Sequence, residues 1–507
     1  MKSKKIISIE TFKKKIYKKK LNICLTHGVF DFFHVGHKRY LEKAKSFGDL
    51  LVVSITTDKY VNKGPARPVF NQNLRAEMVA SLETVDYVIL NDDETSVSII
   101  NQIKPKFYVK GKDYKNLKRD LTKNIYKEKY AVEKNRGKIV FTDEIQFSSS
   151  SIINNFYKPE AILNAIKRLK YDPKHFSEMC LSSLKEISSL KVAIVGEIIF
   201  DEYIYSKEMD KPSKENIHAV NFKNKENYLG GVLAIAKNLS QFSNKIDLYS
   251  SGSFNLYEEK LIKNIQKNFK NISLNIEKSD FQTIKKTRIL NEENKKVFEI
   301  YFKNGNAKYS KNKNFLKKIE KKFKQYDVVM ICDFGHGFFS NQIYEKIIKY
   351  SKKVCINVQT NSDNRGFNLI TKYKKGNLIS IDEPEIRLAL SEKYSDFETM
   401  TKNLSKKIKF DVLVVTRGNL GITVFKKNRY SKFKSISLPA FELRPLDTIG
   451  AGDAVFGIVS LLQSKKTDVA ILAFLGNMFG AFATRYLGHS SYIKRNDIFK
   501  AITYSLK

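Results

Sequence analysis

Two histidines stand three residues apart, directly after the first apolar stretch of the chain. Residues 26–37 read THGVFDFFHVGH, so His34 and His37 flank a glycine. We expect a strand at 23–30 and a helix at 36–47, and an open parallel sheet binds its ligands at the carboxyl ends of its strands. The start of a helix also offers unpaired N–H groups and the positive end of a dipole to a phosphate. A single histidine is more often structural, but this pair predicts a site for a phosphate group.

A glycine-rich segment later in the chain could do different chemistry. Residues 447–456 read DTIGAGDAVF and open an apolar helix. The N–H groups of Gly450, Ala451 and Gly452 would form an anion hole for a phosphoryl group in transfer. Asp453, which follows directly, could take the proton of an attacking hydroxyl. A tight helix cap would also explain the glycines, but the aspartate at this spacing favours phosphoryl transfer.

The elements that must position these residues follow from the alternation of apolar runs and helical stretches. Short apolar strands separated by helices predict an α/β fold with two doubly wound parallel sheets. In the first series we expect strands at 23–30, 50–55, 87–90, 107–109 and 138–141 and helices at 36–47, 73–82 and 96–102. In the second series we expect strands at 191–195, 246–249, 328–332, 353–357, 378–381 and 412–416, with a short polar antiparallel element within 204–227.

These series divide the chain into four predicted segments. They are a basic N-terminal segment (1–20), a first α/β domain (21–157), a helical linker without visible chemistry (158–189) and a second α/β domain (190–507). Within the second domain, the lysine-rich stretch 306–326 is expected to form a loop and a solvated helix.

The composition excludes several classes of protein. Hydrophobic residues make up 42% and aromatic residues 12% of the 507 residues, which excludes a wholly disordered chain. The four cysteines lie far apart without a CxxC pair, which indicates a reducing compartment. No apolar run reaches the ~18 residues of a membrane span, and the basic N-terminus lacks the apolar core of a secretory signal. We therefore expect a cytoplasmic protein with no membrane partner.

The charge leaves two alternatives. Lys and Arg number 91 and Asp and Glu 53, a formal net charge of +38, and such a basic surface attracts nucleic acid. Alternatively, the whole sequence is biased toward Lys, Asn, Ile, Tyr and Phe, and that bias spreads lysines over every solvated face. Because no recognition helix, zinc-ligand spacing or base-stacking motif is visible, we favour the bias and expect no nucleic-acid partner.

The motifs around the histidine pair resemble those of the HxGH nucleotidyltransferases, the cytidylyltransferase-like superfamily with Rossmann-like domains. The resemblance covers about residues 20–157, and GVFDFFHVGHKRYLEKAKSFGD looks like the transferase half of the bifunctional heptose kinase/adenylyltransferases. Glycerol-phosphate cytidylyltransferases are also similar in this segment. The further matching motifs are KGPARP (63–68), RAE (75–77), VDYV (85–88), VKGKDY (109–114) and the serines of 148–151. Lys112 departs from the family, which commonly has a second glycine there.

This resemblance implies that an oxygen of a sugar phosphate or polyol phosphate attacks the α-phosphorus of ATP or CTP, and that pyrophosphate leaves. His34 and His37 would hydrogen-bond the triphosphate, Lys45 would approach its phosphates, and Mg²⁺ would bridge them. The resemblance also implies nucleotide binding by Gly28, Phe30, Arg75, Lys110, Asp113, Ser149 and Ser150. Lys45 could equally be a solvated surface residue, and Asp31 could merely cap its turn.

Residues 190–507 resemble the PfkB (ribokinase-like) carbohydrate kinases. VGE (195–197) and FDEY (200–203) are similar to the opening strand of the heptose kinases, and CDFGHG (332–337) to a later strand end. The resemblance implies that Asp453 is the catalytic base beside the anion hole of Gly450, Ala451 and Gly452. It further implies sugar binding by Asp201, Gly230, Gly231 and Asn238 and nucleotide binding by Thr416 and Gly418. Ser213 and Glu215 fall in the family's lid segment, so we expect a small β lid.

Three places depart from the kinase pattern. Ala234 stands where the family has an asparagine, and Asn357-Val358-Gln359 replaces the usual Asp-Pro-Lys. Asp382 to Glu385 read DEPE where the family has an NxxE motif that orders Mg²⁺-bound water. Glu385 could hold the metal through water, or it could be an ordinary surface glutamate. The changes suggest an altered acceptor or a slow kinase.

Both modules occur together in the bifunctional ADP-heptose enzymes, but there the kinase comes first. We therefore expect a bifunctional enzyme that prepares a nucleotide-activated sugar or polyol for surface polysaccharide, with sugar, sugar phosphate and ATP or CTP as its partners. The alternative is a monofunctional nucleotidyltransferase whose kinase-like domain only binds a ligand. We also expect a homo-oligomer, as a dimer.

Overall fold

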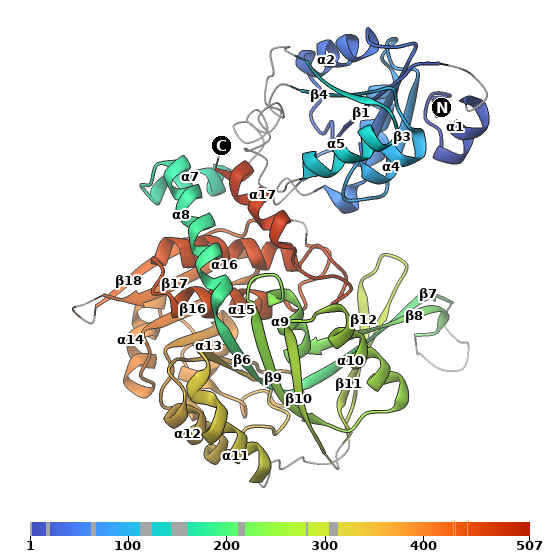
Figure 1. The fold of residues 1–507 in the computed structure, drawn as a ribbon. Helices are drawn as coiled ribbons and strands as arrows, with labels where there is room; N and C mark the ends of the chain where they lie inside the picture. Colours follow the sequence, from blue (N-terminus) through green and yellow to red (C-terminus); the bar gives the residue numbers. More distant parts are fainter. Residues whose placement is uncertain are drawn as a thin grey trace. The chain divides into compact units, whose positions relative to one another are not determined.

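The structure of the protein is a computed structural model, drawn in Figure 1. It describes residues 3–16, 21–61, 67–111, 124–142, 160–210, 218–279, 282–303, 313–428, 430, 432–443 and 445–506. The chain divides into two compact units, one formed by residues 1–160 with 496–507 and the other by residues 161–495.

A five-stranded parallel sheet in the order β3-β2-β1-β4-β5 organises the first unit (Figure 1). Its strands are β1 (Ile23–Gly28), β2 (Leu50–Thr56), β3 (Tyr87–Asn91), β4 (Phe107–Gly111) and β5 (Lys138–Thr142). The strand order reverses between β1 and β4, and such a switch point is where doubly wound sheets bind ligands. The predicted strands are confirmed to within two residues at each end.

Helices cover both faces of this sheet. They are α1 (Ile9–Ile16), α2 (Val35–Lys45), α3 (Gln72–Ala80), α4 (Val97–Ile103) and α5 (Asn124–Lys134), and α17 (Arg495–Ser505) groups with this unit from its second residue onward. One apolar cluster joins the sheet to α2 and α3, and a second joins it to α1, α4 and α5. Because both faces are covered, the central strands are continuous runs of buried apolar residues.

A nine-stranded sheet in the order β10-β9-β6-β13-β14-β15-β16-β17-β18 forms the centre of the second unit. Its strands are β6 (Lys191–Gly196), β9 (Lys245–Gly252), β10 (Ile272–Lys278), β13 (Val328–Asp333), β14 (Val354–Val358), β15 (Leu378–Asp382), β16 (Val412–Thr416), β17 (Ile422–Lys427) and β18 (Phe433–Leu438). Strands β10 to β16 are parallel and β17 and β18 are antiparallel. The six strands predicted for this unit are present, whereas the sequence did not indicate β10, β17 and β18.

The helices of the second unit form layers on both faces of its sheet. They are α7 (Glu160–Arg168), α8 (Pro173–Glu186), α9 (Val232–Leu239), α10 (Leu256–Asn268), α11 (Lys313–Lys322), α12 (Asn341–Tyr350), α13 (Glu383–Leu390), α14 (Phe397–Lys407), α15 (Ala451–Ser464) and α16 (Val469–Ala483). Helices α11 to α14 share one apolar cluster with the sheet. Residues 161–189, which the sequence suggests as a linker, group with this unit, and Phe176 of α8 packs edge-on against Phe474 of α16.

A separate four-stranded sheet in the order β12-β11-β7-β8 forms the expected β lid (Figure 1). Its strands are β7 (Ile198–Glu208), β8 (Val220–Gly231), β11 (Ile284–Leu290) and β12 (Lys296–Phe302). β7 and β8 are antiparallel, as predicted for 204–227, but the sequence did not indicate β11 and β12. The cross-strand pairing places Asp201 and Arg288 on one face of this sheet and Phe222 and Phe298 on the other.

Candidate active sites

The histidine pair builds the start of α2. His34 is its N-cap residue, and the Nδ1 atom of His34 accepts a hydrogen bond from the N–H of Gly36 at 3.0 Å. The Nδ1 atom of His37 accepts one from the N–H of His34 at 3.4 Å, so the two side chains close a capping box, and their rings stack with centroids 4.1 Å apart. Because both Nδ1 atoms are acceptors, each neutral ring carries its proton on Nε2, and Nε2 can donate to a phosphate oxygen.

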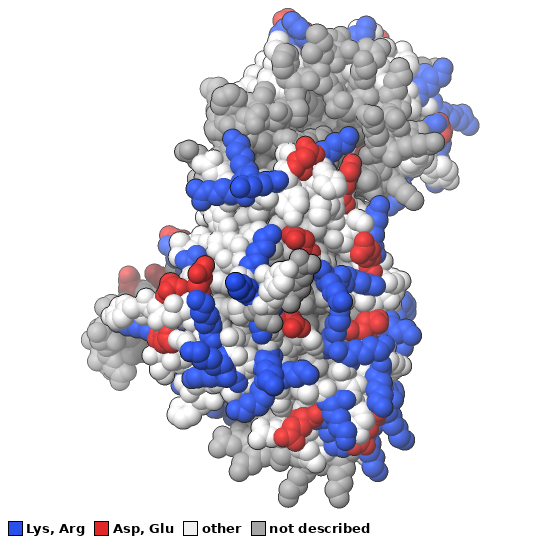
Figure 2. All heavy atoms as spheres, turned by 90° about the vertical axis from the view of Figure 1, so that its left-hand side faces the viewer, with Lys and Arg blue, Asp and Glu red and all other residues white. Residues whose placement is uncertain are grey.

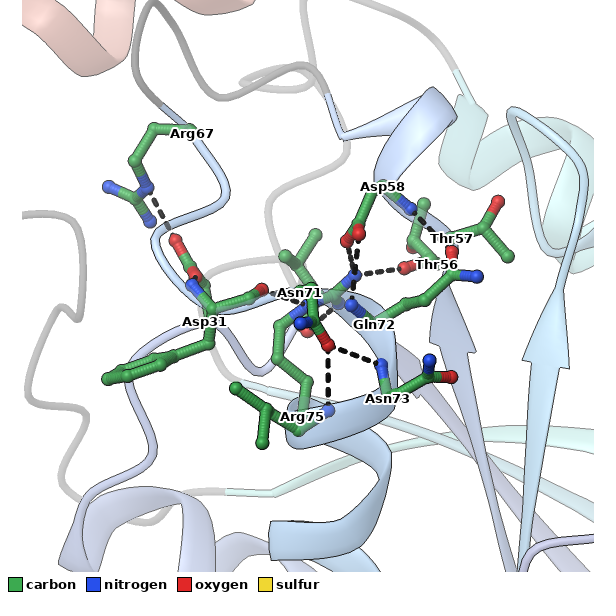
Figure 3. A network of polar contacts seen from close by, with 12 residues as sticks. Asp31, Thr56, Thr57, Asp58, Arg67, Asn71, Gln72, Asn73 and Arg75 are labelled. Atoms are coloured by element: carbon green, nitrogen blue, oxygen red, sulfur yellow. Dashed lines mark hydrogen bonds and ion pairs between the residues drawn. The ribbon is translucent and has the colours of Figure 1, made fainter. Parts of the chain in front are cut away.

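Buried groups fix the loop that leads to these histidines. Phe30 has a left-handed backbone, with φ at 51°, and its ring packs edge-on against His37 at a centroid distance of 5.4 Å. A Cβ on Gly28 would meet the Phe30 ring at 3.0 Å, so this close approach favours glycine. Asp31 is buried, forms an ion pair with Arg67 at 2.6 Å and accepts two backbone N–H groups from the following loop (Figure 3). Asp31 therefore organises the turn, and Gly28 and Phe30 lie next to the histidines.

Arg75 joins three backbone segments of the first unit. Its Nε donates to the carbonyl of Phe70, its Nη1 to that of Val29, and its Nη2 to that of Thr56 and to the carboxylate of Asp58 at 2.6 Å (Figure 3). Its side chain is only 1% exposed. The predicted contact of Arg75 with a nucleotide is therefore not supported, because the guanidinium is already engaged in holding the loop after β1 to β2 and α3.

Lys110 lies at the end of β4, beside β1 at the switch point, and it is engaged in a buried ion pair. Its Nζ is 2.9 Å from a carboxylate oxygen of Glu128 on α5, and Ser96 donates to the same carboxylate at 2.7 Å. Burial acts to raise the pKa of Glu128, but the Lys110 ammonium and the Ser96 hydroxyl hold it below its usual value. Burial, with the nearby Lys110 charge, lowers the pKa of His27 to about 4. The position of Lys110 agrees with a role at a phosphate, which stays a prediction.

Lys45 lies at the wrong end of α2 for the role that the resemblance implied. It is the last residue of that helix, 11 residues long, whereas His34 caps its beginning. At about 1.5 Å per residue the two ends are roughly 15 Å apart. The Lys45 ammonium instead pairs with Asp86 at 2.6 Å and donates to the carbonyl of Asp49. An approach of Lys45 to the phosphates is therefore not supported.

Some predicted positions lie outside the described residues. In the first unit these are Asp113, Ser149, Ser150 and residues 63–66, and in the lid they are Ser213 and Glu215. The roles that the resemblances imply for them stay predictions.

A cavity of about 440 Å³ in the second unit brings most of the predicted kinase residues together. The predicted residues that line it are Asp201, Gly231, Glu385, Thr416, Gly418, Gly450, Ala451, Gly452 and Asp453. They come from the lid strands β7 and β8, the start of α13, the end of β16 with the turn after it, and the start of α15. The volume is in the range of small-molecule sites.

The first turn of α15 forms one wall of this cavity. Gly450 is its N-cap residue with φ at 77°, and a Cβ there would lie 2.4 Å from Cε1 of His489, so only glycine fits. A Cβ on Gly452 would meet no atom within 4 Å, which leaves room for a ligand against the backbone. The first N–H groups of a helix have no partner within the helix, so this wall can bind an anion. The N–H of Ala451 already donates to the carbonyl of Thr448 at 3.3 Å, so the anion would be bound chiefly by the N–H groups of Gly450 and Gly452.

Asp453 lies in that same first turn and is buried. Burial raises the pKa of its carboxyl to about 7, although the amide of Gln359 donates to its Oδ1 at 2.5 Å and acts in the opposite direction. A carboxylate that titrates near neutral pH is suited to accept a proton from an attacking hydroxyl.

Two cationic side chains of the lid strand β11, Lys286 and Arg288, also line the cavity. Arg288 forms ion pairs with Asp201 at 2.5 Å and with Glu299 at 2.8 Å. His489 lies 3.8 Å from the other carboxylate oxygen of Asp201, and burial lowers the pKa of both His489 and Lys286. Asp201 therefore stands where predicted, but with cations around it.

The diglycine is required by close packing. A Cβ on Gly230 would lie 2.2 Å from Oδ2 of Asp201, and one on Gly231, where φ is 58°, would lie 2.3 Å from the carbonyl oxygen of Glu197. Gly231 reaches the cavity. Asn238 is not among the lining residues, because its amide oxygen accepts the N–H of Ile493 at 3.2 Å and ties α9 to that segment. A sugar contact by Asn238 is therefore not supported.

Glu385 faces the cavity but is held by the backbone. Its two oxygens accept the N–H groups of Thr360 at 2.7 Å and Asp382 at 3.1 Å, and Asp382 in return caps α13. Burial, together with the neighbouring Asp382, raises the pKa of Glu385 to about 8. Among the described residues no group of three His, Cys, Asp or Glu side chains could hold a metal ion. A water-mediated role of Glu385 stays a prediction.

The sequence did not single out four residues that line this cavity as binding residues: Lys286, Arg288, Gln359 and His489. Lys286 and Arg288 lie in a lysine-rich stretch, so two further cationic residues there do not indicate a binding role in the sequence. Gln359 was visible only as a departure from the kinase pattern.

The comparison with protein families decides the classification. The profile of the pfkB family carbohydrate kinases matches residues 189–495, which is more than half of the chain. The chain belongs to the pfkB carbohydrate kinase family. A cytidylyltransferase-like profile matches residues 25–155, so a domain of that type precedes the pfkB domain.

Curated relatives match the cytidylyltransferase-like region. The chain is 45% identical over 108 residues to the bifunctional protein HldE of Aliarcobacter butzleri, which is 21% of this chain and 23% of that protein. It is 36% identical over 151 residues to the HldE protein of Helicobacter pylori strain J99, which is 29% of this chain and 30% of that protein. The chain thus spans about a quarter of the length of the relatives it matches.

Solved structures support the fold of the pfkB domain. Phosphofructokinase-2 from Escherichia coli, solved in complex with potassium, aligns over all of its length and 63% of this chain, with a TM-score of 0.50 and 13% identity. At this identity the likeness concerns the fold. Within the described part of the chain, every helix is too short or too polar to cross a membrane.

Proposed function

We propose that the chain is a bifunctional enzyme, a sugar kinase joined to a nucleotidyltransferase that together make a nucleotide-activated sugar or polyol. The observation that carries the kinase half is the single cavity lined by the anion hole of Gly450 to Gly452, the base Asp453 and the lid residue Asp201. In the proposed step, the acceptor hydroxyl loses its proton to Asp453 while its oxygen attacks the γ-phosphorus of ATP, the bond from the γ-phosphorus to the bridging oxygen breaks, and ADP leaves. The N–H groups of α15 stabilise the charge on the transferred phosphoryl group.

The transferase half rests on the capping box of His34 and His37. Its two Nε2–H groups and the start of α2 would bind the triphosphate of ATP or CTP. An acceptor phosphate oxygen then attacks the α-phosphorus, and pyrophosphate leaves. Such catalysis is mostly positioning and neutralisation of charge, which suits neutral histidines and helix N–H groups.

The cations of the lid favour an acceptor that is itself anionic. Lys286 and Arg288 line the cavity together with the anion hole. Arg288 is paired with Asp201 and Glu299, whereas no ion pair of Lys286 is found among the described residues, so its ammonium could bind an anionic group. A sugar phosphate would complete this charge balance better than a neutral sugar. The resemblance of the transferase half to the heptose kinase/adenylyltransferases favours a product of the nucleotide-activated heptose type, with surface polysaccharide as its use.

Mg²⁺ would enter with the nucleotide in both halves. It is usually held by substrate phosphates and only one or two carboxylates, so the pair Asp382 and Glu385 at the cavity wall fits a water-mediated site. The metal would neutralise phosphate charge, and the chain's own groups would orient the reactants.

We also propose that the chain forms a dimer through its lid. The pairing register places Phe222, Phe298 and Phe302 on the lid face opposite Arg288, and all three side chains are exposed. They lie on the two edge strands β8 and β12 of this sheet, and exposed apolar side chains on one face can form a contact surface.

A screen of the full chain tests the two activities separately. ATP with a panel of sugars and sugar phosphates is followed by ADP release, and each nucleoside triphosphate with sugar phosphates is followed by pyrophosphate release. We expect Asp453→Asn to lower ADP release at least 100-fold while pyrophosphate release persists, and His37→Ala to do the reverse.

The second candidate function is a nucleotidyltransferase whose pfkB domain only binds a ligand, which the changed residues 357–359 and 382–385 motivate. It predicts pyrophosphate release without ADP release for every acceptor. ADP release that Asp453→Asn leaves intact would contradict the assigned base.

A further inference from the structure

A chain of amide hydrogen bonds ends on the carboxylate of Asp453. The Nε2 of Gln359 donates to Oδ1 of Asp453 at 2.5 Å and to the amide oxygen of Asn357 at 3.3 Å. The Nδ2 of Asn357 in turn donates to the carbonyl oxygen of Ser380 on β15 at 3.1 Å. Asn357 and Ser380 are buried, and Asn357, Gln359, Ser380 and Asp453 all line the cavity.

This arrangement fixes which way each amide points. The Ser380 carbonyl can only accept, so the NH₂ group of Asn357 faces it and the Asn357 oxygen faces Gln359. The Gln359 NH₂ group therefore has both of its protons directed, one to Asn357 and one to Asp453. Asn357 lies on β14 and Gln359 directly follows the end of that strand, and the hydrogen bond between their side chains joins the two positions.

The same two positions hold charged residues, an aspartate and a lysine, in the kinases that this domain resembles. In this chain both are neutral amides. The two departures compensate each other, because the pair keeps a connected set of hydrogen bonds without a net charge. If the residues at positions 357 and 359 had changed at random after a loss of function, a buried polar group would be left without a hydrogen-bond partner. Such a group costs about 1–3 kcal/mol of folding free energy.

We propose that Gln359 is a positioning residue for Asp453: it occupies Oδ1, leaves Oδ2 for the acceptor hydroxyl, and sets the proton affinity of the base. This inference rests on the proposed kinase function, for which Asp453 is the base. Gln359 itself touches neither the phosphate nor the acceptor in this role.

The other groups that act on Asp453 come from three further strands. The carboxylate of Asp201 on β7 raises the pKa of Asp453, and the ammonium of Lys286 on β11 lowers it. The thiol of Cys332 on β13 also lies nearby, but burial raises its pKa well above the usual value, so it stays neutral. Burial raises the pKa of Asp453, and the hydrogen bond from the Gln359 amide is the largest of the effects that lower it.

The test replaces Gln359 in the full chain by three residues of similar length. Gln359→Met removes the donor, Gln359→Glu adds a like charge, and Gln359→Lys adds an opposite charge. The first measurement is the titration midpoint of the Asp453 carboxyl, followed by ¹³C NMR on aspartate-labelled protein; its signal is assigned by its loss in Asp453→Asn. The second measurement is the midpoint of the acidic limb in the pH profile of kcat/KM for ADP release.

We expect both midpoints to rise in the order Lys, Gln, Met, Glu at position 359, with neighbouring variants about one pH unit apart. At pH 6.5 Gln359→Met should be about tenfold slower than the parent and should regain most of its rate at pH 9. The thermal unfolding midpoint serves as a control, and Gln359→Lys, which restores the family's residue, still tests the order if Gln359→Met does not fold.

The two hypotheses fail in different ways. Equal carboxyl midpoints in all variants, or midpoints out of this order, would overturn the positioning role. Ordered midpoints in a protein that phosphorylates no acceptor would uphold the positioning role and reject the proposed kinase activity.

Discussion

At the scale of single residues, the sequence predicted the positions of the candidate site residues better than it predicted the contacts of their side chains. His34, His37 and Asp453 stand where the motifs predict, at the starts of α2 and α15. Arg75 and Lys45 carry the right charge, but the structure engages them elsewhere. Their partners come from distant segments, so no local pattern could show that a motif arginine is surrounded by carbonyls.

In the proposed function the histidines have two separable roles, in folding and in binding. His34 caps α2 through Nδ1, and in the proposed function its Nε2 would donate to a phosphate. Asparagine is a strong N-cap residue but has no atom at the position of Nε2. A substitution at this position can therefore keep the helix and remove the phosphate donor.

We predict that His34→Asn lowers kcat/KM for pyrophosphate release at least 100-fold while the thermal unfolding midpoint of the protein stays within about 1 °C of the parent. His34→Ala should lose the same activity and in addition about 1 kcal/mol of stability, because the cap is lost too. Stopped pyrophosphate assays and calorimetry measure the two effects. Full activity in His34→Asn would show that only the cap matters.

At the scale of elements, the parallel strands were predictable and the lid was not. Strands buried on both faces are continuous apolar runs, which is why β6, β13 and β16 were found at nearly their observed bounds. The lid strand β11 carries two lysines and an arginine, and β12 is mostly exposed, so neither is a continuous buried apolar run and they lack that signal. Thus the cationic residues that line the cavity, Lys286 and Arg288, belong to the part that the sequence could not show.

The start of α15 has two glycines, and different physical requirements favour glycine at the two positions. Gly450 needs its left-handed backbone and its distance from His489, whereas Gly452 has helical geometry and open space at the Cβ position. Alanine is a better helix former than glycine by about 1 kcal/mol. The two positions therefore separate the shape of the element from its use as an anion hole.

We predict that Gly452→Ala keeps or slightly raises the thermal stability but lowers ADP release at least tenfold, because its methyl group occupies the space of the phosphoryl group. Gly450→Ala should lower both, because it strains the backbone and displaces His489. Differential scanning fluorimetry and the ADP assay compare the pair. Unchanged ADP release in Gly452→Ala would place the transferred phosphoryl group elsewhere.

At the scale of the whole molecule, the formal net charge is +38. On the face drawn in Figure 2, Lys and Arg are spread over the described surface, with Asp and Glu among them. Several described lysines pair with acidic neighbours, as Lys38 does with Glu42 on α2 and Lys223 with Glu292 in the lid. The predicted compositional bias explains such dispersal, whereas a nucleic-acid site would gather the cations on one surface.

We therefore predict that the protein binds a phosphate polymer only weakly and loses it below ~0.2 M salt, because scattered contacts release counterions without specific bonds. Charge reversal at two exposed lysines of α5, Lys127→Glu with Lys134→Glu, should weaken this binding as much as reversal at two on α14, Lys402→Glu with Lys406→Glu. Fluorescence anisotropy with labelled single-stranded and duplex oligonucleotides at several salt concentrations measures both. Retention above that salt concentration, or a much larger effect of one pair, would mean that the charge forms a binding surface after all, beyond the few cations that the two phosphate sites require.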